Sequence, residues 1–342
     1  MKKFTLYILT AFGLMGLATS CNDFGDVNND PMNLNPGVVD YKMEFTQVEA
    51  QICGSDWDVW RNGCIYTANM IQHTASVDWA YGVFYTWNDQ YSGAYWGGFY
   101  SGGRAAIRNI IDVMNNWEGD PAYTNEYQMC RILKAYMFQN MTDLYGDVPY
   151  SEAGQGYSTN PIPYPKYDTQ EAIYDDLLKE LDEAQAALST SAGNTIGAAD
   201  VIYNGDAAKW KKFANSLMLR VAMRLTKVAP DKAKTWVAKA VSNGLFVSND
   251  DNAIVRHTNG SPSDDSAEPY GKVFSSLDTQ AFYISETFIN ILQDDPRLSL
   301  VATVCTRDPK PGWGDADFDL GDNTAAKQKG MPVGYDVSGG DW

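Results

Sequence analysis

Residues 131–150 have the sequence RILKAYMFQNMTDLYGDVPY, which gives the clearest indication of the fold class. Apolar residues recur through it at spacings of three and four, which places them on one face of an α-helix. They are Cys130, Leu133, Met137, Met141 and Leu144. Gly146 and Pro149 are typical of the point where a helix ends. The segment after Pro121 is therefore predicted to be one amphipathic helix of about six turns.

Similar patterns lie on both sides of this segment. Asp168 as N-cap and Glu171 three residues later predict a capping box before an apolar helix face at 173–188. Residues 210–225 repeat the pattern, with Arg220 and Arg224 one turn apart on the same side. Further helices are expected at 38–53, 59–73, 89–117, 232–241 and 279–292. Because no long alternation of apolar and polar residues competes with them, the chain is predicted to be mainly α.

Helices joined by short turns favour a specific architecture. Antiparallel pairs of this kind suggest an α-solenoid-like core of degenerate tetratricopeptide-type helix pairs, although no clean repeat of about 34 residues is present. Residues 246–276 and 305–342 are rich in Gly, Asp, Pro and Ser and lack periodicity. They are expected to be long irregular loops, where function often resides.

The first 21 residues indicate a lipoprotein signal peptide. Lys2 and Lys3 precede an apolar run at 4–17 that is too short to cross a bilayer, and small residues lead to Cys21. We expect residues 1–20 to be removed and Cys21 to become the lipid-modified N-terminus, which several acyl chains attach stably to a membrane. An ordinary secretory signal and a retained membrane helix are the alternatives. Residues 21–36 would then be a flexible tether, and 37–342 a single helical domain.

Charge and composition narrow the class of partner. The net charge of −17 becomes −19 when Lys2 and Lys3 leave with the leader, which argues against nucleic acid and anionic membrane surfaces. Aromatic residues make up 13% of the chain, and Tyr and Trp dominate them. In an extracellular protein such an excess serves either the core or surfaces that stack on sugars.

Four cysteines follow Cys21 and are spread too widely for a zinc finger or a redox pair. They are Cys53, Cys64, Cys130 and Cys305. Cys53 and Cys64 both lie in apolar helical patterns, which favours two buried free thiols. A disulfide between them in an oxidising compartment is the alternative.

Aromatic residues crowd the segment 79–100. Those at 91–100 follow helical spacing, which favours core packing. Four others lie in a connection punctuated by Gly and Asp, where an exposed ring could stack on a pyranose. These four candidates are Trp79, Tyr81, Tyr85 and Trp87. A second loop offers hydrogen-bonding side chains for a hydroxyl-rich ligand, namely Arg256, Asn259, Asp265 and Tyr270. Packing within the first loop and plain solvation of the second are the alternatives.

Metal and catalytic motifs are weak. The acidic run at Asp315, Asp317 and Asp319 is similar to a calcium loop, but Gly321 comes one place late and Ala326 occupies the twelfth position, so no metal is expected. The chain has two histidines and no H-E-x-x-H, G-x-S-x-G or P-loop motif. We expect no cofactor and no catalytic residues. Among 43 acidic residues a carboxylate pair for glycoside hydrolysis stays open, so a glycan-degrading enzyme is the alternative.

The stretch at 131–150 resembles the SusD/RagB family of outer-membrane nutrient-binding lipoproteins. Two further segments agree with that family in order and spacing, YDTQEAIY at 167–174 and WKKFANSLMLRVAMR at 210–224. Short matches extend the resemblance over nearly the whole chain. They are DVNNDP at 26–31, DPRL at 295–298 and GMPVG at 330–334.

This resemblance implies one α-helical domain that lies on a SusC-type TonB-dependent transporter, with which it captures and imports glycans. It also implies a lipid-anchored position on the outer membrane, facing the exterior, and Asp23 and Asp26 suit an export signal behind Cys21. Members usually continue far beyond the GMPVG segment, so the domain is expected to be incomplete at its C-terminus. We therefore expect a glycan-binding lipoprotein without catalysis. A surface enzyme and a helical adaptor that binds only protein are the alternatives.

Overall fold

The computed structural model describes residues 39–101, 105–156, 160–257, 268–273, 282–304 and 321–335. Its α-helices are α3 (Tyr41–Gln51), α4 (Asp56–Asp58), α5 (Asp89–Ser92), α6 (Ala94–Tyr100), α7 (Ala106–Trp117), α8 (Thr124–Tyr145), α9 (Gln170–Ala187), α10 (Ala207–Arg224), α11 (Pro230–Asn243), α12 (Pro269–Lys272), α13 (Glu286–Leu292) and α14 (Leu298–Val301). A π-helix, η1 (Val59–Ala68), continues α4 directly. The prediction of a mainly helical chain is confirmed.

The strands are short and tie loops to helices. β1 (Thr74–Ala75) pairs antiparallel with β4 (Tyr283–Ile284), and β2 (Val148–Pro149) pairs antiparallel with β3 (Tyr167–Asp168). In the second pair Val148 lies opposite Asp168, and Pro149 opposite Tyr167. Both pairs join segments that are distant in sequence, so they position connections and do not form a sheet core.

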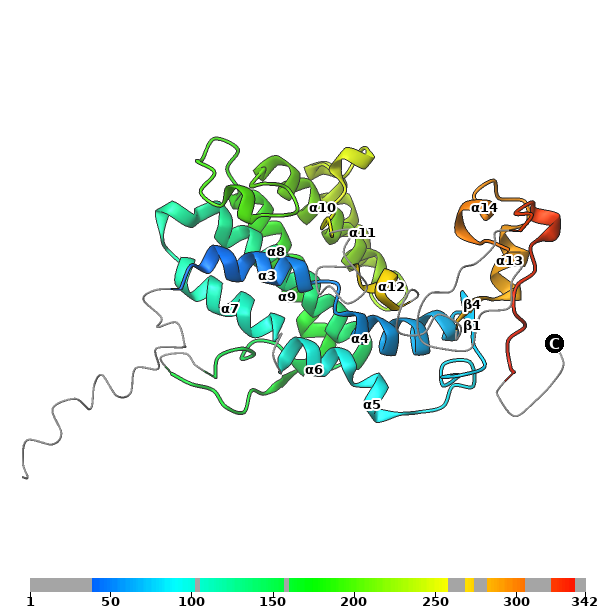
Figure 1. Ribbon diagram of the computed structural model, residues 1–342. Helices are drawn as coiled ribbons and strands as arrows, with labels where there is room; N and C mark the ends of the chain where they lie inside the picture. The colour runs from blue at the N-terminus through cyan, green and yellow to red at the C-terminus, as the bar shows by residue number, and fades with distance from the viewer. Residues whose placement is uncertain are drawn as a thin grey trace, which may run out of the picture. The chain divides into compact units, whose positions relative to one another are not determined.

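Successive long helices pack on one another in chain order. α8 contacts α7 on one side and α9 on the other, α9 packs on α10, and α10 packs on α11 (Figure 1). Large apolar side chains are fully buried along this series, among them Phe138 of α8, Leu177 of α9 and Trp210 of α10. Because each buried methylene group contributes about 0.8 kcal/mol, these faces hold the helices together. The arrangement confirms the predicted tetratricopeptide-like series.

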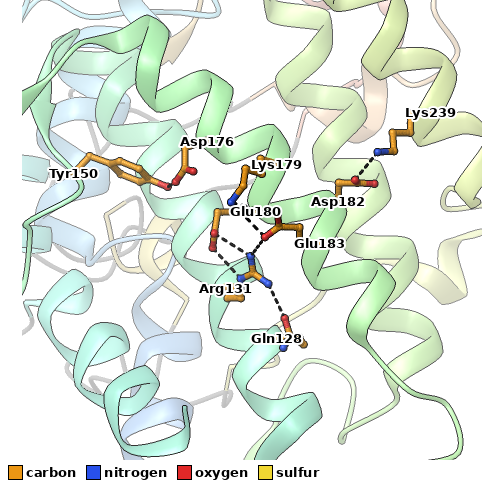
Figure 2. Close-up of polar contacts among 9 residues, drawn as sticks. All are labelled: Gln128, Arg131, Tyr150, Asp176, Lys179, Glu180, Asp182, Glu183 and Lys239. Carbon is orange, nitrogen blue, oxygen red and sulfur yellow. Dashed lines mark hydrogen bonds and ion pairs between the residues drawn. The ribbon is translucent and has the colours of Figure 1, made fainter. Parts of the chain in front are cut away.

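Charged side chains reinforce the packing between α8 and α9 (Figure 2). Arg131 Nε lies 2.9 Å from Glu180 Oε2, and its Nη2 lies 2.6 Å from Glu183 Oε2. Burial alone would raise the pKa of Glu180, but the hydrogen bonds and charge of Arg131 outweigh it and hold that pKa below its usual value. Tyr150 donates to Asp176 at 2.6 Å, and Lys239 of α11 bonds to Asp182 of α9. These carboxylates are engaged in helix packing.

Helix boundaries differ from the sequence prediction in several places. The helix predicted at 279–292 was wrong in its first part, because Tyr283 and Ile284 form β4 and α13 begins only at Glu286. The regular π-helix in the predicted segment 59–73 ends at Ala68. The N-cap of α9 is Thr169, whose hydroxyl accepts from Ala172 N at 3.3 Å, so the predicted Asp168 cap was wrong. Asp168 belongs to β3 instead, and its carboxylate accepts from Ser151 N at 2.7 Å. The predicted helix at 89–117 is three helices, interrupted at Gly93 and again before α7. These errors arise because a local sequence pattern does not show where a helix begins, ends or is interrupted when tertiary contacts decide the boundary.

The described cysteines, Cys53, Cys64 and Cys130, are free thiols. Cys64 and Cys130 are buried, whereas Cys53 is exposed, so the expectation of burial was wrong for Cys53. That residue lies just past the end of α3, before Gly54, which takes a left-handed φ of 84° and turns the chain. Cys21 and Cys305 lie outside the described residues, as do 1–38. The described residues from 42 onward belong to one compact unit. Among the described helices, none is both long and apolar enough to span a membrane.

Candidate functional site

The π-helix η1 and the connection that follows it form the base of the site. A π-helix of ten residues is rare, and such elements are frequent at functional sites. Gly82 in the connection donates its N–H to Ile65 O at 3.1 Å. A Cβ atom at Gly82 would lie 2.4 Å from that oxygen, so only glycine fits there. The connection is thereby held tightly against η1.

Five rings from this region form an aromatic cluster, defined as Trp57, Trp60, Trp79, Tyr81 and Tyr91. Trp60 lies at its centre, buried, with its ring centre 5.5 Å from that of Trp57, 5.1 Å from Trp79 and 5.7 Å from Tyr91. These three contacts are edge-to-face, a geometry that contributes about 0.5–1.5 kcal/mol per pair beyond burial. Trp79 is 37% exposed and Trp57 is half-exposed at the rim. The cluster therefore presents ring surface to solvent in a fixed orientation.

Backbone strain marks the same connection. Trp79 and Tyr85 have φ angles of 56° and 54°, in the left-handed region that side-chain-bearing residues rarely adopt. Contacts retain both residues there, since Trp79 packs on Trp60 and the Tyr85 hydroxyl donates to Met70 O at 3.2 Å. Strained positions of this kind concentrate at binding sites, which makes the connection a candidate for function.

The sequence-predicted aromatic candidates separate into two pairs. Trp79 and Tyr81 belong to the aromatic cluster, and Tyr81 also stacks on Tyr66 with ring centres 6.4 Å apart. Tyr85 is 68% exposed and Trp87 is 75% exposed, and the Trp87 indole N–H donates to the Asp89 carboxylate. The first pair is thus anchored by packing, and the second pair projects from the same connection.

The second predicted loop is only partly described. Tyr270 on α12 lies against η1, because a Cβ atom at Gly63 would be 3.2 Å from its hydroxyl oxygen. Burial raises the pKa of Tyr270, so its hydroxyl stays protonated and able to donate. Arg256 is exposed, and within the described ranges no hydrogen bond or ion pair joins it to the cluster. Asn259 and Asp265 lie outside the described residues, as do Asp315, Asp317 and Asp319.

Arg61 is a candidate that the sequence reasoning missed. Its guanidinium lies 5.2 Å from the Trp57 ring centre and 5.9 Å from that of Tyr91, in cation–π contact with both. Its Nε atom is buried without a hydrogen-bond partner. The residue as a whole is partly exposed, so the rest of its guanidinium group is a candidate donor to a ligand oxygen beside the rings. The four-residue spacing of Trp57 and Arg61 could have indicated this pair, but the segment 59–73 was interpreted only as a core helix.

The arrangement suits recognition of a ligand by ring faces and hydrogen bonds. Flat rings with one exposed side pack on the apolar face of a sugar ring, and Arg61 and Tyr270 supply donors for hydroxyl groups. No group of three or more His, Cys, Asp or Glu residues that could hold a metal ion occurs in the part of the chain that the structure describes.

A helical series with a partly exposed aromatic cluster is compatible with ligand-binding proteins, and comparison with known families narrows this class. The chain belongs to the SusD-like family, whose profile, described as starch-binding and associating with the outer membrane, matches residues 39–336. The predicted family membership is confirmed. No curated protein matches the chain.

Solved structures agree with this assignment. A SusD-like structure from the Bacteroidetes is 33% identical, with a TM-score of 0.67 over 76% of this chain and 50% of its own. A chitin-binding protein is 31% identical, with a TM-score of 0.69 over 86% of this chain and 60% of its own. A chitin-binding SusD homolog from Flavobacterium johnsoniae is 25% identical, with a TM-score of 0.65 and coverages of 87% and 58%. The chain thus spans between half and three fifths of the length of these structures.

Proposed function

We propose that this protein binds glycan chains at the cell surface without cleaving them, and that the aromatic cluster is its binding site. The observation that carries the proposal is the partly exposed Trp79 ring, held by Trp60 and by a strained backbone in a member of a family described as starch-binding. Two similar structures are described as chitin-binding. A pyranose chain is therefore the ligand class that the chemistry and the comparisons support together.

Binding would combine stacking with hydrogen bonds. The exposed faces of Trp57 and Trp79 would receive sugar rings, and Arg61 would donate to a hydroxyl or ring oxygen at the edge of the cluster. Tyr85 and Trp87 would extend the contact along the connection. Each contact is weak, so affinity would come from several sugar units bound in register.

Affinity electrophoresis of the acyl-free protein, from residue 22 onward, tests this proposal. Gels would contain soluble starch or glycol chitin, and release of reducing ends would be assayed in the same samples. Retardation without release is the expected result, and release would overturn the non-catalytic assignment. No retardation by either glycan would favour the protein-only adaptor.

A matched pair of tryptophan variants locates the site. Trp79→Ala is expected to abolish most retardation, because it removes an exposed ring of the cluster. Trp236→Ala on α11, a partly exposed tryptophan outside the cluster, is the control and is expected to keep it. Equal behaviour of the two variants would exclude the aromatic cluster as the site.

We further propose that Cys21 carries a lipid anchor on the outer membrane, with the domain at 37–342 facing the exterior, and that a SusC-type TonB-dependent transporter receives the glycan. The family description, which includes association with the outer membrane, supports this assignment. Cys21→Ala is expected to abolish labelling of the protein by radioactive palmitate and to move it out of the membrane fraction. Co-purification of a β-barrel transporter with the tagged wild type tests the partner, and its absence would contradict delivery.

A further inference from the structure

A second aromatic surface lies outside the aromatic cluster. Trp96 of α6 and Tyr167 of β3 are stacked, with ring centres 6.0 Å apart and an interplanar angle of 23°. Trp96 is fixed from behind, because Tyr145 of α8 meets its ring edge-on at 5.5 Å and its hydroxyl accepts the Trp96 backbone N–H at 3.2 Å. A stack between two elements that are distant in sequence is thus held against the helical series.

The Tyr167 ring is unusually open for a side chain that is so well positioned. It is 62% exposed, and Tyr164 three residues earlier is 91% exposed. The backbone of Tyr167 pairs with Pro149 in the β2–β3 ladder, and the next residue, Asp168, accepts from Ser151 N at 2.7 Å. An exposed ring that is already ordered loses little conformational entropy when a ligand covers it.

Charged side chains of both signs flank Tyr167 in the chain and lie on the opposite face of β3. Lys166 Nζ is 3.7 Å from Asp168 Oδ1 and 3.9 Å from Glu152 Oε1. The backbone N–H of Lys166 donates to Glu152 Oε2 at 3.0 Å. These contacts hold the strand that carries Tyr167, and the exposed ring itself offers the flat face on which a pyranose can stack.

The two aromatic surfaces are connected through one carbonyl group. Ser92 O accepts from Asn62 Nδ2 of η1 at 3.0 Å and from the Tyr145 hydroxyl at 2.8 Å. Tyr91 of the cluster and Trp96 of the stack are five residues apart, so their Cα atoms are at most about 18 Å apart. A glycan chain of several sugar units is long enough to reach from one surface to the other.

We propose that Tyr167, supported by Trp96, is a second pyranose-stacking subsite, and that it and the aromatic cluster engage one glycan chain at two points. The proposal rests on the proposed glycan-binding function. When one end of a chain is bound, the other end has a high effective concentration at the second subsite, so affinity rises steeply once the chain spans both. Disaccharides would bind at one surface and would not sense the other.

Isothermal titration with maltose, maltoheptaose, chitobiose and chitohexaose tests the inference. Tyr167→Ala is expected to weaken binding of the longer chain by about tenfold and to leave binding of the disaccharide unchanged. Tyr167→Phe keeps the ring and is expected to bind as the wild type does. The melting temperature of each variant would be measured as a control for folding. If Tyr167→Ala melts at a lower temperature than the wild type, Tyr167→Leu replaces it, and it too is expected to weaken binding of the longer chain and not of the disaccharide.

The outcomes separate this inference from the proposed function. If Tyr167→Ala binds the longer chain as tightly as the wild type while Trp79→Ala does not, the second subsite is excluded and glycan binding stands. If Tyr167→Ala loses the same factor of affinity for the disaccharides as for the longer chains, Tyr167 belongs to the same site as Trp79, and the two-point arrangement is wrong. If the wild type binds none of the four sugars and is not retarded in gels that contain either polysaccharide, both the proposed function and the second subsite are excluded.

Discussion

Glu49 of α3 is predicted to make this protein less stable as the pH rises. The side chain is fully buried, its Oε2 accepts from Val201 N at 2.8 Å, and its Oε1 is buried without any donor. Asp200 lies beside it and accepts N–H bonds from Tyr203 at 2.9 Å and from the Trp210 indole at 2.7 Å. Burial first, and the Asp200 charge second, raise the pKa of Glu49 to about 10. The folded protein therefore holds a neutral Glu49 whose proton can be shared with Asp200.

The sign and size of the effect follow from proton linkage. The unfolded chain releases this proton near the ordinary pKa of 4.5, whereas the folded chain keeps it up to about 10. Between these values the folded state binds one more proton, so its stability falls as the pH rises, by up to about 1.4 kcal/mol per pH unit. From pH 5 to pH 8 the loss attributable to Glu49 would approach about 4 kcal/mol. Below pH 4.5 the contribution is fully present.

Glu49→Gln removes the pH dependence that Glu49 causes. The amide is neutral at every pH, can accept from Val201 and can donate to Asp200. The free energy of unfolding of the variant is therefore expected to lack the fall with pH that is attributable to Glu49. Urea unfolding of the wild type and the variant at pH 5, 6, 7 and 8 measures the difference in the free energy of unfolding. The variant is expected to gain stability relative to the wild type with each step in pH. Glu171→Gln, at an exposed position in the first turn of α9, is the control. Parallel stability profiles for the wild type and Glu49→Gln would refute the reasoning.

Three further predictions concern the site and the helical core. Gly82→Ala is expected to cost about 1–3 kcal/mol in thermal unfolding, because its Cβ would lie 2.4 Å from Ile65 O, and an unchanged melting temperature would contradict the close approach. Arg131→Met is expected to cost about 3–5 kcal/mol in urea unfolding at pH 7, because it leaves Glu180 unpaired, and the loss should shrink in acid as Glu180 is protonated. Arg61→Met keeps the apolar stem and removes the donors, so retardation by glycan should weaken about five- to tenfold while the melting temperature stays unchanged. Retardation equal to that of the wild type would exclude Arg61 from the site.

Much of the fold could be predicted from the sequence, because the long helices bury one face against a neighbour. The spacing of apolar residues at 130–144 predicts α8, and the same periodicity predicts α9, α10 and α11 within a few residues at each end. The errors fall where local signals compete. Asp168 and Thr169 can both cap a helix, and only the pairing of Asp168 with Val148 and Ser151 decides between them.

The candidate site could be predicted only in outline. The connection at 79–87 was identified from its aromatic content, but the sequence does not separate the packed Trp79 from the exposed Trp87. Arg61 was missed, because its role depends on rings from Trp57 and Tyr91 that meet only in the folded chain.

The mainly helical class, the order of the long helices and the family can be predicted from the amino-acid sequence, because helical periodicity, capping and motif spacing are local properties of the chain. The contacts on which the proposals rest form only in the folded chain. Trp96 meets Tyr167, which lies 71 positions later in the sequence, and Glu49 meets Val201, which lies 152 positions later. Which rings stay exposed and which carboxyl group loses its water depend on the path of the folded chain, and no short window of sequence encodes that path.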